Sequence, residues 1–185
     1  MAFPPAHMLV GAGVAEVVRS AAPPLPRWRA WAVGAALAVV PDLDFVLDLV
    51  LQRGATYHGT FTHSLVATLV VALAAGALAG RRWALLAGAG YGSHLLVDLL
   101  DDRGRTNVLV WWPLSDERPL AIARVFPKVP FWVGGRLEDS VRSLGQPEVL
   151  VALARQTGVA LLLFLALLAV ALIVRRARSA RGAPT

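Results

Sequence analysis

The sequence predicts an all-α protein: a polytopic membrane helical bundle of four or five membrane segments with a partly helical extramembrane lobe. Hydrophobic residues make up 57% of the 185-residue chain, and its mean hydropathy is +0.61. Charged residues make up only 16% and gather in short stretches between long apolar runs. A water-soluble domain of this size does not need so much apolar surface, so the lipid bilayer is the expected solvent and partner of the chain.

The most distinct membrane segment is predicted at residues 158–174. This run carries no charge and is followed directly by Arg175 and Arg176, which is typical of a membrane helix that ends at the cytoplasmic face. The other predicted segments are residues 63–80 and 83–100, which together indicate a helical hairpin, residues 30–51, which Pro41 interrupts, and a shorter stretch at residues 8–18, which either spans the membrane or lies at its interface.

Composition divides the chain into three parts. Residues 1–100 contain the membrane segments that carry the candidate site, and residues 158–185 contain the last membrane segment and a basic tail. Between them, residues 101–157 are rich in proline, arginine and acidic residues, which predicts an extramembrane or interfacial lobe. Its aromatic residues, including Trp111 and Trp112, suit the headgroup layer, where amphipathic rings are enriched.

The arginines of this chain indicate its membrane topology. A net charge of +6 in a soluble protein would suggest nucleic acid as a partner, but here the arginines lie mainly beside apolar runs, so nucleic-acid binding is the less favoured interpretation. Clusters at residues 19–29, 81–82 and 175–181 are all expected to face the cytoplasm. The opposite ends of the same segments then face outward.

The polar residues of the membrane segments fall at those outward ends. A charged group at membrane depth costs about 2.5–3.5 kcal/mol, so several carboxylates there need an aqueous cavity or a compensating cation. The chain has no cysteine, so a metal must be held by histidine, carboxylate and water. The candidate metal ligands are His7, Asp42, Asp44, His58, His63, His94 and Asp98.

Local spacing supports some of these candidates more than others. His94 and Asp98 are four residues apart on a predicted helix, so both side chains are within reach of one ion. Asp42 and Asp44 are two apart and would diverge on a continuous helix, but Pro41 can open a new first turn there. We therefore expect these two aspartates to differ in role, one as a ligand and the other contacting a second ion, a water or a ligand imidazole.

Each candidate also has an interpretation without a metal. His7 could be an interfacial histidine, and His94 with Asp98 could be a hydrogen-bonded pair. One of the two aspartates after Pro41 could cap a helix, where the dipole favours a carboxylate. Asp48 is assigned to structure, and Thr62 is the expected cap of the helix that follows His63. The gathering of histidines beside aspartate-bearing segments favours the metal.

The pattern resembles the membrane-bound metal-dependent hydrolases, a family also described as LexA-binding, inner-membrane-associated hydrolases. The resemblance covers roughly residues 1–115, and one departure is Gly59, where the family commonly carries an arginine. The matching residues are His7, Pro41-Asp42-Leu43-Asp44, His58 through Thr62-His63-Ser64, Ser93-His94-Leu95-Leu96-Val97-Asp98, Gly104 and Trp112-Pro113-Leu114.

The resemblance implies an enzyme of a bacterial-type inner membrane. Nitrogen and oxygen ligands suit zinc, or alternatively manganese or iron, and the number of candidates permits two ions. Asp42 and Asp44 would be the catalytic residues, one of them as a general base for a metal-activated water. The expected substrate is a phospholipid or another lipid-linked phosphoester, given an interfacial site and an arginine-rich lobe.

Two other classes of function stay open at this point. Intramembrane aspartate and histidine also line ion pathways, which would suit a transporter or a metal-binding membrane protein without catalysis. A regulatory membrane scaffold is the third class, supported only by the family's LexA-binding description. The sequence does not indicate an oligomeric state.

Overall fold

The structure, a computed structural model, describes residues 2–21, 25–51, 57–101, 106, 108–127, 129 and 137–181. Every regular element within these residues is a helix, which confirms the predicted all-α class. The elements are α1 (Pro4–Ala21), α2 (Arg27–Leu37), the 3-10 turn η1 (Val40–Leu43), α3 (Asp44–Val50), the 3-10 turn η2 (Phe61–His63), α4 (Leu65–Ala79), α5 (Arg81–Leu99), α6 (Leu137–Leu144) and α7 (Pro147–Ala180).

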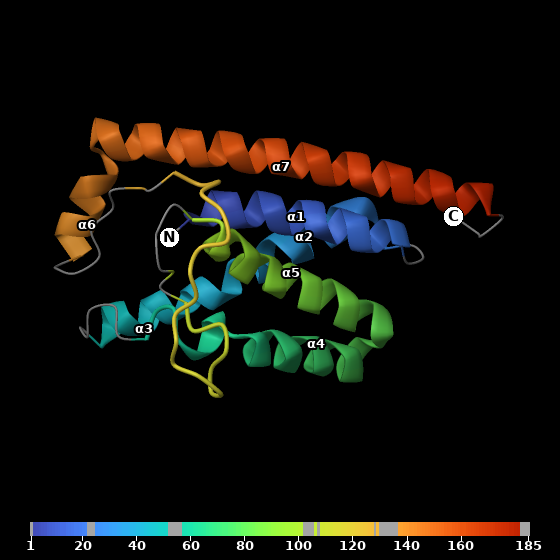
Figure 1. Cartoon of the computed structure of the whole chain (residues 1–185), viewed down its shortest axis with the longest axis horizontal. Coiled ribbons are helices and arrows are strands. Elements are labelled where there is room, and N and C mark those ends of the chain that lie inside the picture. Colours follow the sequence, from blue (N-terminus) through green and yellow to red (C-terminus); the bar gives the residue numbers. More distant parts are fainter. Residues whose placement is uncertain are drawn as a thin grey trace.

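Helix α1 lies at the centre of the bundle. It packs against α7, α2 and α5, and α4 packs on α5 at the far side (Figure 1). The C-terminal ends of α1 and α7, the start of α2 and the turn between α4 and α5 all lie toward the right-hand end in Figure 1. The arginine clusters therefore lie toward one end of the molecule, while the start of α1 and the end of α5 lie toward the other.

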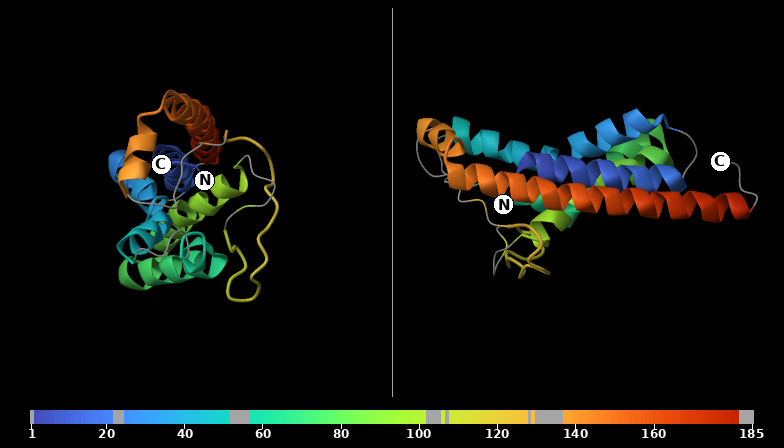
Figure 2. Two further views of the ribbon diagram at one scale, coloured as in Figure 1. Left: turned by 90° about the vertical axis from the view of Figure 1, so that its left-hand side faces the viewer. Right: turned by 90° about the horizontal axis from the view of Figure 1, so that it is seen from above.

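The long C-terminal helix α7 is the only described helix that by itself is long and apolar enough to cross a membrane. Its 34 residues extend about 51 Å at 1.5 Å per residue, well beyond an apolar core of about 30 Å. The helix continues without a break through the predicted domain boundary at residue 157 and projects beyond the rest of the bundle (Figure 2).

The second span candidate is broken in the middle. Helices α2 and Val40–Asp48 pass the length and hydropathy test only together, and they are bent by 43°. The break contains Pro41 in the 3-10 turn η1, as the sequence predicted. Helix α4 is apolar and exposes Leu69, Leu73 and Leu78, but it is only 15 residues long. Among the described residues, one helix is thus able to cross a membrane by length and composition, or two if the bent pair is one span, and a total of four or five stays a prediction.

Two glycines let α1 and α2 cross with their backbones in contact. A Cβ on Gly11 would lie 2.4 Å from the carbonyl oxygen of Gly34, and a Cβ on Gly34 would lie 2.5 Å from that of Gly11. Real Cβ atoms do not approach other atoms so closely, so only glycine fits at either position. In α5, Gly90 faces the same crossing, where a Cβ on Gly90 would lie 3.4 Å from the Cα of Gly34. Three helices therefore meet tightly at one level.

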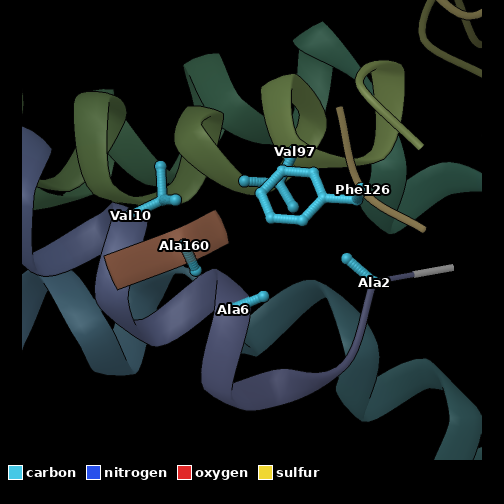
Figure 3. Packing of buried hydrophobic residues seen from close by; sticks show 6 residues of the cluster. All are labelled: Ala2, Ala6, Val10, Val97, Phe126 and Ala160. Carbon is cyan, nitrogen blue, oxygen red and sulfur yellow. The ribbon is translucent and has the colours of Figure 1, made fainter. Parts of the chain in front are cut away.

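The buried hydrophobic cluster joins α1 to α5 and α7. Its side chains include Val10, Val97, Phe126 and Ala160, which Figure 3 shows facing one another. Phe126 belongs to the segment after α5, and its N–H donates to the carbonyl of Leu100. Because this segment is attached to the end of α5, part of the predicted lobe lies directly beside the polar end of the bundle.

Candidate metal centre

The structure brings all seven predicted ligands together at one end of the bundle. His7 comes from the first turns of α1, His94 and Asp98 come from the end of α5, and the other four come from the segments around η1 and η2. Three groups of side chains are close enough to hold a metal ion. They are His7, His94 and Asp98; Asp42, His63 and His94; and Asp44, His58 and His63.

Four of these side chains are linked in a ring by nitrogen–oxygen distances under 4 Å. The Nε2 atom of His94 lies 3.2 Å from Oδ2 of Asp98 and 3.6 Å from Oδ1 of Asp42. The Nε2 atom of His63 lies 3.6 Å from the same Asp42 oxygen and 3.8 Å from the same Asp98 oxygen. These four distances connect two imidazoles with two carboxylates, and we call these four residues the inner cluster (Asp42, His63, His94 and Asp98).

The spacing within the inner cluster is wider than that of charge-assisted hydrogen bonds and close to the spacing of ligands around one ion. A charge-assisted N–H···O bond has an N···O distance of about 2.7–2.9 Å. Four ligands at about 2.0–2.1 Å from a tetrahedral zinc ion would instead stand about 3.3–3.4 Å apart. The observed distances of 3.2 to 3.8 Å surround this second value. The donors fit an ion of this size.

Several buried atoms of the site have no hydrogen-bond partner. They include Nε2 of both His63 and His94, Oδ2 of Asp42, Oδ1 of Asp98 and both ring nitrogens of His7. Leaving such a group unpaired costs about 1–3 kcal/mol, and more for a charged one. A cation between them would compensate the carboxylates and use the nitrogen lone pairs together, and a set without sulfur suits zinc, manganese or iron(II).

The orientation of His94 is set by the broken helix. Its Nδ1 lies 2.8 Å from the backbone carbonyl of Ala38, which follows the last turn of α2. That carbonyl can only accept, so Nδ1 carries the proton and Nε2 presents its lone pair to the inner cluster. Gly34 and Gly90 lie four residues before Ala38 and His94, so the helix crossing positions both partners one turn away.

His7 lies against the back of this cluster. Its ring stacks on that of His94 with centroids 4.0 Å apart, and its Nε2 lies 3.7 Å from Oδ1 of Asp98. This is the oxygen that does not face His94. Asp98 thus lies between two imidazole groups and could serve two ions or one ion with a fifth ligand.

Asp44 does not point into the inner cluster. One oxygen lies 2.8 Å from Nδ1 of His58, and the other accepts from the Thr62 hydroxyl and lies 3.2 Å from Nδ1 of His63. The Thr62 hydroxyl that donates to Asp44 also lies 2.9 Å from Nδ1 of His63, so Asp44 and Thr62 together hold the ring of His63 and leave its Nε2 for the cluster. The two aspartates after Pro41 occupy different positions, as expected from their spacing.

Other residues that hold the site were assigned differently or missed in the sequence. Asp48 accepts hydrogen bonds from the backbone N–H groups of Tyr57 and His58, which fits the structural role predicted for it. The cap of α4 is Ser64 rather than Thr62, because the Ser64 hydroxyl accepts from the N–H of Ala67. The hydroxyl of Tyr91, a residue not considered from the sequence, donates to the carbonyl of Thr62.

Comparison with known proteins gives the family of this chain. A family model described as YdjM inner membrane protein matches residues 1–180, nearly the whole chain. No curated protein and no solved structure matches it. The description of the family agrees with the apolar span in α7 and names a location without an activity. The chain belongs to the YdjM inner membrane protein family, and it is a protein of the inner membrane.

Proposed function

We propose that this protein is a membrane-embedded, metal-dependent hydrolase whose ion is held by Asp42, His63, His94 and Asp98. The observation that carries this proposal is the spacing of the inner cluster, in which buried imidazole nitrogens stand 3.2 to 3.8 Å from carboxylate oxygens without hydrogen bonds. Zinc is the first choice for such nitrogen and oxygen donors, with manganese or iron as alternatives.

The residues around the inner cluster are assigned three roles: positioning of His63, a further metal ligand, and the side from which substrate approaches. Asp44 and His58 hold the ring of His63 and do not face the ion. His7 is available to a second ion or to a larger coordination number through the free oxygen of Asp98. Asp42 is the most accessible member of the cluster, with its side chain 11% exposed against 0 to 7% for the others. We therefore assign substrate approach to the side of Asp42.

Asp42 is also the best-placed general base. Its Oδ1 faces both imidazoles, while its Oδ2 has no hydrogen-bond partner and is free to accept a proton. A divalent ion bound by the cluster would lower the pKa of a coordinated water to about 7 and polarise a phosphoester oxygen. Asp44 has its oxygens engaged by His58, Thr62 and Gly59, so its contribution would come through the position of His63.

The proposed substrate class is supported by the segment after α5, residues 108–127, which lies beside the site. Two backbone hydrogen bonds attach this segment to the site, from Leu109 to Gly59 and from Leu65 to Val110. The same segment exposes Trp111 (53%) and Leu114 (85%), which suit the interface between headgroups and acyl chains. A phospholipid or another lipid-linked phosphoester would place its phosphate at the cluster while its chains stay in the bilayer.

The experiment compares Asp42→Asn with Asp44→Asn in protein purified in detergent. Bound zinc, manganese and iron are measured per chain, together with release of a chromogenic phosphodiester. Asp42→Asn is expected to lose both metal and hydrolysis, because a ligand charge and the base are removed together. Asp116→Asn, a substitution in the segment after α5, is the matched control and should keep both.

Different outcomes separate the candidate functions. Metal bound by the wild-type protein without any hydrolysis, on the soluble ester or on phospholipid vesicles, would favour a non-catalytic metal-binding protein or a transporter. Full metal and full activity in both variants would exclude the acidic pair from the site. Absence of metal from protein purified with zinc present would remove the basis of the proposal.

A further inference from the structure

The end of the molecule opposite the inner cluster contains a second buried carboxylate, that of Glu16 in α1. Arg19 of the same helix donates to both of its oxygens at 2.8 Å, and Arg175 of α7 donates to Oε1 at 2.7 Å. The indole N–H of Trp31 in α2 donates to Oε2 at 3.0 Å. Three helices are thus joined through one carboxylate that is completely buried.

The arginines around Glu16 outnumber the carboxylates. Four N–H groups already occupy Glu16, which offers about four acceptor positions. Arg27 adds a third guanidinium, whose Nε lies 3.6 Å from Oε1 and whose Cζ lies 4.5 Å from the centroid of the Trp31 ring. Three cations against one anion leave a formal excess of two positive charges.

The only other acid of these three helices is Glu148, which lies in the first turn of α7, 27 residues before Arg175. Residues 17–41 and 149–185 contain no aspartate or glutamate. Arg27 and Arg175 have side chains 52% and 39% exposed, so they present N–H donors outward. Arg178 donates to the carbonyl of Ser20 at 3.2 Å, which holds the end of α7 beside the end of α1. The result is a preformed, outward-facing group of guanidinium donors.

We propose that this arginine group (Arg19, Arg27 and Arg175 around Glu16) binds the phosphate of an anionic phospholipid. A planar guanidinium matches the oxygens of a phosphate with two parallel hydrogen bonds. The apolar run of α7 ends directly before Arg175, so these donors lie where the hydrocarbon core gives way to headgroups. Basic pockets between membrane helices on the cytoplasmic side recognise anionic headgroups in this way.

The test is thermal unfolding of the full-length protein in a zwitterionic detergent. Phosphatidylglycerol, phosphatidylcholine with the same acyl chains and inorganic phosphate are titrated separately. The variant is Arg27→Gln, because Arg27 has only an ion pair with Glu16 at 3.6 Å, so its loss leaves the hydrogen bonds of Glu16 to Arg19, Trp31 and Arg175 in place. The matched control is Arg29→Gln, an exposed arginine two residues away whose guanidinium lies over the ring of Trp28.

The expected result is an increase in unfolding temperature with phosphatidylglycerol and none with the other two additions. One arginine near an anionic headgroup contributes about 1 kcal/mol, so Arg27→Gln should weaken the apparent affinity about fivefold while Arg29→Gln stays near wild type. An equal effect of phosphatidylcholine, or of inorganic phosphate, would overturn the assignment to an anionic lipid. Equal weakening by the two variants would show a general charge effect and overturn the site.

Discussion

The two ends of this molecule each bury carboxylates, but they satisfy them in opposite ways. Glu16 receives donors from Arg19, Arg175 and Trp31 at 2.7 to 3.0 Å, all within the range of good hydrogen bonds. At the other end, Asp42 and Asp98 face imidazole nitrogens at 3.2 to 3.8 Å, and several of the atoms have no hydrogen-bond partner.

Burial of a charge is therefore not by itself evidence for a ligand. Around Glu16 the chain provides arginines, so the carboxylate is a joint between three helices. Around Asp98 the chain provides the imidazoles of His7, His63 and His94, whose nitrogens can share a metal ion with a carboxylate. The distances and the unpaired atoms, rather than the residue types, separate the two sites.

The largest effect is expected from removing an imidazole of the inner cluster. A structural zinc site contributes about 10–16 kcal/mol over four ligands, or about 3 kcal/mol each, so His94→Ala should reduce metal affinity by more than about 100-fold. His63→Ala should do the same. Metal content after dialysis measures both, with Glu16→Gln as the buried control that keeps its metal. Unchanged stoichiometry in both histidine variants would exclude a shared ion.

Removing the carboxylate at the arginine end should affect stability instead. Glu16→Ala leaves Arg19 and Arg175 close together without their anion, which we expect to cost about 3 kcal/mol, at the lower end for a broken buried pair because the arginines keep some contact with water. Thermal unfolding in detergent measures this loss, and the bound metal per chain should not change. A variant as stable as the wild type would show that the network is not a joint between helices.

An intermediate effect is expected at Asp44. Asp44→Asn keeps the shape of the side chain but weakens its hold on the rings of His58 and His63, as happens when a partner behind a metal ligand is changed. We expect metal affinity to fall by about 10- to 100-fold, less than for His94→Ala. Competition with a graded series of chelators resolves the difference. A loss as complete as that of a ligand variant would move Asp44 into the coordination sphere.

The smallest effect is expected at Asp98 in protein stripped of metal. Its carboxylate then still faces the imidazoles of His7, His63 and His94 at 3.2 to 3.8 Å, so Asp98→Asn should lower stability by about 1 kcal/mol. Glu16→Gln under the same conditions should lower stability more, because Glu16 accepts four hydrogen bonds. Unfolding curves recorded with excess chelator give both values. An Asp98→Asn variant more stable than the wild type would show that the imidazoles do not compensate this carboxylate.

The candidate ligands that the structure brings together could be selected from the sequence because their chemistry is rare in such a chain. Four histidines and a few aspartates at the ends of apolar runs have a high cost in a membrane unless a cation compensates them. The helix-breaking effect of Pro41 was also predictable, since it depends on the proline ring alone. The divergence of Asp42 and Asp44 followed from their spacing of two residues.

Only the tertiary structure shows which ring nitrogen of each histidine faces the inner cluster, because this depends on residues far apart in the sequence. Ala38 selects the tautomer of His94 across 56 positions, and Asp44 holds the Thr62 hydroxyl that faces Nδ1 of His63 across 18 positions. Spacing and hydropathy within one segment do not predict contacts between residues so far apart in the sequence. The crossing of Gly11 with Gly34 was missed for the same reason, since a glycine in an apolar run does not indicate which helix will pack against it.

The chemistry and the local breaks can thus be derived from the sequence alone: apolar runs that suit a bilayer, arginines that end them, and histidines and aspartates that are candidate ligands. The tertiary structure alone shows that Glu16 faces arginines of three helices while Asp98 faces imidazoles. Hydropathy and spacing act over one or two turns of a helix, whereas the partner of a buried charge is chosen by packing between helices, and packing brings together residues that the sequence separates by as many as 159 positions.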